Sequence, residues 1–142
     1  KRTTEDAIVD FSRGFNRLAT RIDSERDRQL TSSVEYGLFR RAYESAYPDD
    51  YNRVVKSHQG STAERNHPLE VIRTAEDPLE EAEKQALFIV GARLLEQTHD
   101  EGLTIKIVLD IAYQNEITLP SNSLAALRAT KEILDTLDSN SH

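Results

Sequence analysis

The chain has 142 residues, of which 18 are Lys or Arg and 25 are Asp or Glu, so its formal net charge is −7, and it contains no Cys, Met or Trp. No apolar run approaches the roughly 18–20 residues that a transmembrane helix needs, which excludes an integral membrane protein. The absence of cysteine excludes a disulfide scaffold, a Cys-ligated metal site and a thiol nucleophile.

Length and turn-forming residues together predict one helical domain. A chain of this size typically folds as a single domain, and it contains only five Gly and four Pro, which do not gather into a linker. We therefore predict a single domain over residues 1–142. The chain begins with Lys1-Arg2 and has no initiator Met, which favours a trimmed chain or an excised segment.

A first helix is predicted from the N-terminal capping pattern. Thr3-Thr4 precede two acidic residues, which suit the first turn of a helix. Apolar residues then recur with alternating spacings of three and four, which places them on one stripe of a helix running to about Arg26. These residues are Ile8, Phe11, Phe15, Leu18 and Ile22.

Two further helices are predicted before the middle of the chain. Ser32 and Glu35 form a capping-box pattern that opens a helix toward Tyr47. Pro48 ends that helix, and Asp49-Asp50 can cap a short third one. The polar segment 57–67 shows neither the helical nor the strand periodicity of apolar residues, and it is predicted to be the main loop.

The second half opens with a short helix at Pro68 and then contains the strongest helix start in the chain. Asp77-Pro78 supply a cap and a proline for the first helical position, followed by acidic residues. The helix is predicted to cover about residues 78–98, with Gly102 as the residue just past its end.

Residues 103–111 are ambiguous because their apolar residues fit both a strand and a helix. Two strands would form only a marginal sheet, so we favour the helix, although a strand stays open. A last helix follows from Ser121, and residues 139–142 form a frayed tail. The predicted fold is an all-α, compact bundle of five to seven helices around a largely buried central helix at about 78–98.

Residues 86–95 are apolar on every side of a helix except for Arg93, so this segment is predicted to be buried. An unpaired buried charge is costly, and Arg93 therefore needs an acidic partner. Asp110 lies among the apolar residues of the next segment and is the predicted partner in a buried ion pair.

The first helix also carries a stripe of arginines opposite its apolar side, with Asp10 as the acidic companion. Such a stripe is usually a solvated face, but it can also contact an anion, a nucleic-acid backbone or an acidic protein. The stripe consists of Arg13, Arg17, Arg21 and Arg28.

The second helix carries an apolar and aromatic arc of about 220°, wider than one buried stripe requires. The arc can belong to a central core helix or to an interface, where Tyr and Arg are preferred. Its tyrosines and the neighbouring arginines are Tyr36, Tyr43, Tyr47, Arg40 and Arg41.

Charge is distributed unevenly along the chain. Residues 1–73 contain 13 basic and 12 acidic side chains, a sum of +1, whereas residues 74–142 contain 5 and 13, a sum of −8. A chain with an Arg-rich and an acidic end can associate with itself or bind oppositely charged partners.

One resemblance concerns acidic pairs. Glu80 and Glu83 are followed by Glu96 and Asp100, a pattern similar to that of the all-helical nucleoside triphosphate pyrophosphatases, although the second pair has three intervening residues where that family has two. The resemblance implies a Mg²⁺ site for a nucleotide. We favour instead the simpler role of the first pair, which is to stabilise a helix N-terminus.

No phosphate loop, nucleophile elbow, zinc motif or EF-hand loop is present, so we predict no catalytic residue, no metal site and no cofactor. The favoured function is a cytoplasmic, non-enzymatic regulatory, adaptor or assembly domain that acts through protein–protein contacts, as an oligomer and without a membrane partner. The alternatives are a nucleic-acid-binding accessory subunit that uses the arginine stripe and, third, a Mg²⁺-dependent pyrophosphatase. The predicted protein-contact residues are Arg13, Arg17, Arg21, Tyr36, Arg40, Arg41, Tyr43 and Tyr47.

Overall fold

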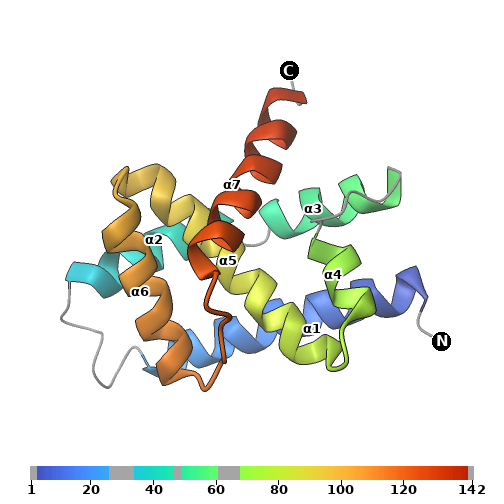
Figure 1. The fold of residues 1–142 in the computed structure, drawn as a ribbon, viewed down its shortest axis with the longest axis horizontal. Helices are drawn as coiled ribbons and strands as arrows, with labels where there is room; N and C mark the ends of the chain where they lie inside the picture. The colour runs from blue at the N-terminus through green and yellow to red at the C-terminus, as the bar shows by residue number, and fades with distance from the viewer. Residues whose placement is uncertain (1–2, 26–33, 47–48, 61–67, 141–142) are drawn as a thin grey trace.

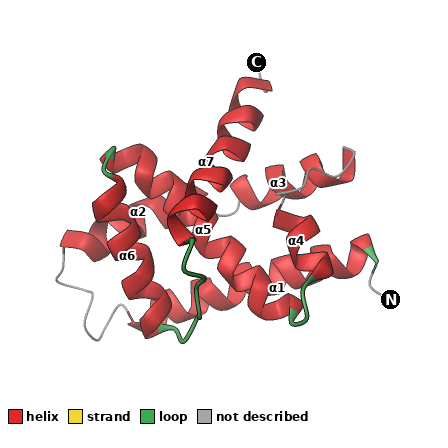
Figure 2. Cartoon of the chain, in the orientation of Figure 1, coloured by secondary structure: helices red, strands yellow, loops and turns green. Residues whose placement is uncertain are grey.

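A computed structural model describes residues 3–25, 34–46, 49–60 and 68–140, and these residues form helices and loops without a strand (Figure 2). The all-α bundle predicted from the sequence is confirmed, with a central helix that contacts most of the others (Figure 1). The helices in chain order are α1 (Thr4–Glu25), α2 (Val34–Ala46), α3 (Asp49–Gly60), α4 (Pro68–Thr74), α5 (Pro78–Thr98), α6 (Glu101–Gln114) and α7 (Ser123–Asn140).

The capping residues that the sequence indicates start two of the helices. Thr3 and Asp6 bond reciprocally at the start of α1, where the backbone N–H of each donates to the side chain of the other at 3.1 Å. At the start of α5, the Asp77 side chain accepts a hydrogen bond from the Glu80 N–H, and Pro78 occupies the first turn.

Helix α5 covers Pro78–Thr98 as predicted, but the residue that caps its end differs from the prediction. His99, not Gly102, ends the helix in the left-handed conformation, with φ of 54°, and its N–H donates to the carbonyl of Leu95. Gly102 lies inside the first turn of α6, where Asp100 is the N-cap and accepts from the Leu103 N–H. The chain thus turns directly from one helix into the next, which leaves no room for a glycine cap.

Other boundaries shift by a few residues. Helix α3 continues to Gly60, so the first part of the predicted loop 57–67 is helical, and its remainder lies outside the described residues. Residues 103–111 form a helix, in the middle of α6. The last helix begins at Ser123 rather than Ser121, and it includes residues 139 and 140 of the predicted tail.

Helix α5 is the centre of the bundle. All ten residues from Ala86 to Leu95 are buried, and α1, α2, α4, α6 and α7 all pack on this helix. In Figure 1, α1 runs beneath α5 while α6 and α7 cover it on the viewer's side. The prediction that this segment is buried on every side is confirmed. Among the described residues, no helix is long and apolar enough to cross a membrane.

Helix α1 lies close against α5 at Gly14. A Cβ atom added there would lie 2.5 Å from the carbonyl carbon of Ala82 and 2.6 Å from the backbone nitrogen of Glu83. Both neighbours are backbone atoms of a helix, so neither can move aside without displacing α5. The absence of a side chain at Gly14 is therefore what allows α1 to lie against α5.

Gly14→Ala is expected to destabilise the fold by about 1–3 kcal/mol, because the cost of overpacking exceeds the gain of about 1 kcal/mol in helix propensity. Gly37 in α2 is the matched control, since an added Cβ there would meet, among the described residues, only the end of the Arg41 side chain at 4.0 Å. Gly37→Ala should leave stability unchanged or raise it. Urea unfolding followed by circular dichroism measures both, and equal stability of the two variants would contradict the steric argument.

Candidate functional site

Arg93 is buried on α5, and its main partner is Asp50 at the start of α3. The guanidinium donates to both carboxylate oxygens, with Nε–Oδ2 at 2.6 Å and Nη2–Oδ1 at 2.9 Å. The prediction that Arg93 pairs with Asp110 is wrong. Asp110 is exposed because it lies on the outer face of α6, between two residues, Val108 and Ile111, that point into the core.

The Arg93–Asp50 pair belongs to a network that joins three helices. Arg93 Nη1 also contacts Glu96 at 2.9 Å and Asp138 of α7 at 3.4 Å. Arg53 of α3 contacts Asp50 at 3.1 Å and bonds to Asp138 as well. The network therefore holds α3 and α7 against α5, and its charges are satisfied inside the fold.

The pKa values in this network favour the charged forms. The hydrogen bond to Asp50 raises the pKa of Arg93, and this effect exceeds that of burial, which disfavours the cation. Burial also disfavours the ionised form of Asp138, but hydrogen bonds from Arg53 and Arg93 lower its pKa. Both groups thus stay ionised near neutral pH, as a structural ion-pair network requires.

Glu83 is a second buried ionisable group on α5, and it faces the arginine stripe of α1. Its Oε2 lies 3.1 Å from Arg21 and its Oε1 lies 3.6 Å from Arg17. Oε2 is buried and accepts no hydrogen bond within the described part of the chain. Burial raises the pKa of Glu83, and the opposing effects of Arg21 and Arg17 offset this only in part.

The arginine stripe is thus only partly directed toward solvent. Arg17 and Arg21 face Glu83, and Arg21 also donates to the carbonyl of Asn115 after α6. Arg13 is exposed, and Arg28 lies outside the described residues. The structure therefore uses two of the three described arginines to join α1 to α5 and to the end of α6.

The acidic pairs of the pyrophosphatase-like pattern do not converge. Glu83 faces arginines, and Asp100 caps α6. Glu96 is 13 residues further along the same helix than Glu83, which corresponds to about 20 Å. Its carboxylate lies instead near those of Asp135 and Asp138 on α7, at the end of the buried network.

Tyr43, predicted as a contact residue, belongs to the core. Its side chain is buried, at 7% exposure, and the Arg40 guanidinium lies 5.4 Å from the centre of its ring. Arg40 also pairs with Glu44 at 3.1 Å, whereas Arg41 is exposed. The Tyr36 side chain and the whole of Tyr47 lie outside what the structure describes.

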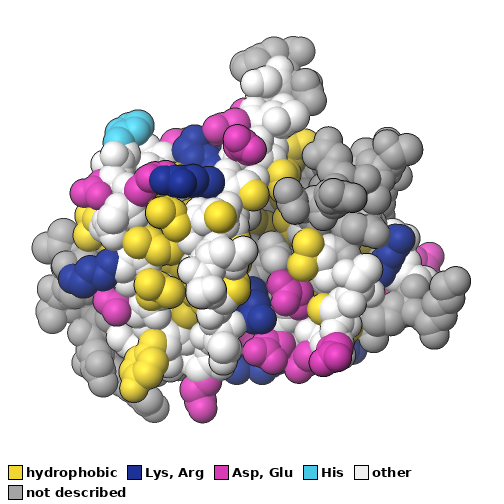
Figure 3. Space-filling model, viewed as in Figure 1, with side chains coloured by type: hydrophobic (Ala, Val, Ile, Leu, Met, Phe, Trp, Pro, Cys, Tyr) yellow, Lys and Arg dark blue, Asp and Glu magenta, His cyan; other side chains and the backbone are white. Residues whose placement is uncertain are grey.

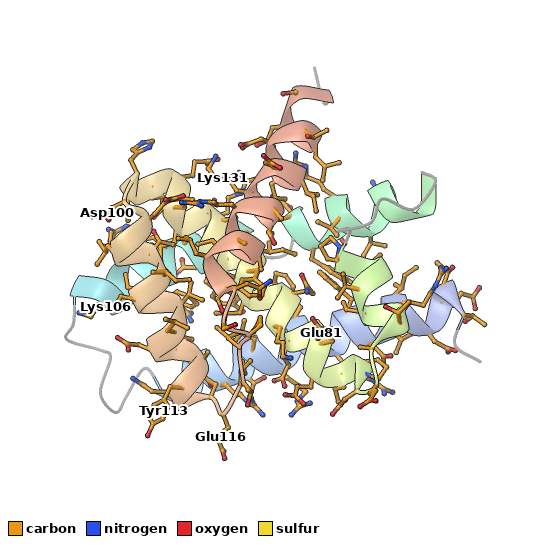
Figure 4. All side chains as sticks on the ribbon, in the orientation of Figure 1. Glu81, Asp100, Lys106, Tyr113, Glu116 and Lys131 are labelled. Atoms are coloured by element: carbon orange, nitrogen blue, oxygen red, sulfur yellow. The ribbon has the colours of Figure 1, made fainter. Side chains whose placement is uncertain are left out.

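Figure 3 shows hydrophobic side chains gathering at the surface over α6 and between α6 and α7. Leu109 is 45% exposed and Tyr113 is 85% exposed, and Ile105 is half-buried one turn before Leu109. A spacing of four places these residues in one row along the helix. Lys106 and Asp110 lie beside that row and are also exposed (Figure 4 labels Lys106 and Tyr113). We call these five residues the α6 face.

The sequence pattern of residues 103–111 already implies exposed apolar side chains on α6, although the α6 face was not among the predicted contact surfaces. Apolar residues alternate through 103–111, and when such a segment is helical they spread around more of the helix than one buried stripe can cover. Some of them must then stay exposed or be covered by another chain. The ambiguity between strand and helix concealed this consequence.

No family model, curated protein or solved structure matches the chain.

Asp50→Asn is expected to destabilise the fold by about 2–4 kcal/mol, because it leaves Arg93 buried without its main carboxylate partner while Glu96 and Asp138 retain contact with it. Asp110→Asn, at the exposed position first predicted to pair with Arg93, is the control and should change stability by less than about 0.5 kcal/mol. Urea unfolding measures both. A larger effect at Asp110 than at Asp50 would refute the assigned pairing.

The raised pKa of Glu83 predicts a pH dependence of stability. The folded state binds this proton more tightly than the unfolded state does, so the contribution of Glu83 to the free energy of unfolding decreases as the pH rises from 4.5 through the folded pKa. Glu83→Gln removes that contribution, and the variant should gain stability relative to the parent with rising pH. Urea unfolding from pH 4 to 7 tests this, and parallel pH curves would contradict it.

Proposed function

We propose that this chain is a non-enzymatic adaptor or assembly domain that acts through protein–protein contact at the α6 face. The observation that carries the proposal is Tyr113, a large aromatic side chain that is 85% exposed on a regular helix and in line with exposed Leu109. Burying aromatic surface is a main source of binding free energy, and Tyr is enriched among the residues that dominate interfaces.

The rigid support of this face favours the same function. The residues on the inner side of α6, Thr104, Ile107, Val108, Ile111 and Ala112, are all buried. The outer side chains are thus presented on a helix that is anchored along its length, which lowers the entropy lost on binding.

The arginine stripe supports the nucleic-acid alternative less well. Arg17 and Arg21 are each directed at Glu83, so a phosphate would have to compete with a buried carboxylate for them. Among the described arginines of the stripe, this leaves Arg13, which is exposed, and one arginine provides little affinity for a phosphate backbone. The cytoplasmic location expected from the sequence stays a prediction.

Photocrosslinking inside the cells that naturally produce the protein tests the proposed function. Tyr113 is replaced there by the photoreactive amino acid benzoylphenylalanine. Ultraviolet light should yield a covalent adduct with a protein, because a contact surface keeps the photoreactive ring against its partner. The matched control is the same replacement at Val9, which is 47% exposed and lies on a different helix, α1. The absence of an adduct at position 113, or equal adduct yields at both positions, would contradict the proposal.

A further inference from the structure

We infer that the partner of the α6 face is a second copy of this chain, packed antiparallel to the first across a two-fold axis beside Leu109. This inference rests on the proposed function, because it identifies the partner at the same surface. It follows from the order of the exposed side chains along α6, which is complementary to itself in apolar contacts and in charge.

The apolar row is symmetric about its central residue. Ile105 and Tyr113 lie four residues before and after Leu109, or about 6 Å along the helix in each direction. A two-fold axis that passes beside Leu109 places the two Leu109 side chains against each other. The same axis brings Ile105 of each copy opposite Tyr113 of the other, so that the most exposed aromatic ring is covered by an apolar side chain.

The charges on the α6 face fit the same axis. Lys106 and Asp110 lie one turn apart, on the same side of the apolar row, and neither has an ion-pair partner among the described residues. Their midpoint is residue 108, about 1.5 Å along the helix from Leu109. The two-fold axis therefore brings Lys106 of each copy near Asp110 of the other and forms two equivalent pairs.

A parallel arrangement of the two α6 faces does not bring Lys106 of one copy near Asp110 of the other. If both helices ran in the same direction, the two-fold axis would be parallel to them and would place the charged residues of the two copies on opposite sides of the apolar row, so that no Lys106–Asp110 pair could form between the copies. Exposed ion pairs contribute little affinity by themselves, so their effect here is to select orientation and partner while the apolar row supplies the attraction. The self-complementary order of charges is what favours a second copy over an unrelated protein.

Sedimentation velocity over a range of concentrations tests the inference on the whole chain. The parent is expected to show a reversible monomer–dimer equilibrium. Leu109→Arg should raise the dissociation constant at least 100-fold by burying a charge at the centre of the contact. Val9→Arg is the matched control at similar exposure, 47% against 45%, and should dimerise like the parent. Circular dichroism checks that each variant is folded.

Variants with reversed charges distinguish the effect of specific Lys106–Asp110 pairs on dimer affinity from the effect of the net charge of the chain. Lys106→Glu and Asp110→Lys should each weaken the dimer about tenfold, because each turns two attractive contacts into repulsive ones. The double variant should return to within about threefold of the parent, since it restores both pairs with their signs exchanged. If net charge alone mattered, Asp110→Lys would strengthen the dimer, because the chain carries a net charge of −7.

A parent that stays monomeric at all concentrations overturns the inference, and so does a double variant that is no tighter than the two single variants. These outcomes differ from failure of the proposed function. If the chain is monomeric but position 113 crosslinks to another protein, the α6 face is a contact surface for a different partner. If no adduct forms at position 113, both the proposed function and the inferred dimer are contradicted.

Discussion

Burial of α5 is the constraint on which the other helices depend. Because residues 86–95 are apolar on every side, they are stable only when other helices exclude water around the whole circumference of α5. Helices from both ends of the chain supply this cover, and α1 approaches closely enough that Gly14 admits no side chain. The positions of α6 and α7 on the opposite side follow, since each buries one face against α5 and leaves the other exposed.

The charges within this core restrict how the surrounding helices can be arranged. Arg93 and Glu83 lie on a helix that is otherwise covered by apolar surface, and each would be costly without an opposite charge. Asp50 reaches Arg93 from α3, and Arg17 and Arg21 reach Glu83 from α1. Displacing α3 or α1 by one helical turn would separate these pairs. The ion pairs therefore contribute to the register of the bundle, beyond whatever net stability they add.

Once α5 is covered and its charges are paired, the α6 face stands out as apolar surface that the fold leaves exposed. Its residues belong to a helix whose inner side is buried, so the apolar row cannot turn inward without exposing Ile107, Val108 and Ile111. Among the predicted contact residues whose side chains the structure describes, Arg17 and Arg21 face Glu83, and Arg40 lies over the buried ring of Tyr43. We therefore propose α6, rather than α1 and α2, as the surface that contacts other proteins.

Local patterns in the sequence were sufficient for the helical class, for the start of α5 at Asp77-Pro78 and for the burial of residues 86–95, because capping and periodicity depend only on residues a few positions apart. The same patterns showed that Arg93 needs a partner. They could not identify Asp50, which is 43 positions away and meets Arg93 only through the packing of α3 on α5. Which tyrosines are covered and which side of α6 stays exposed were likewise decided by tertiary packing, since each depends on what the neighbouring helices cover.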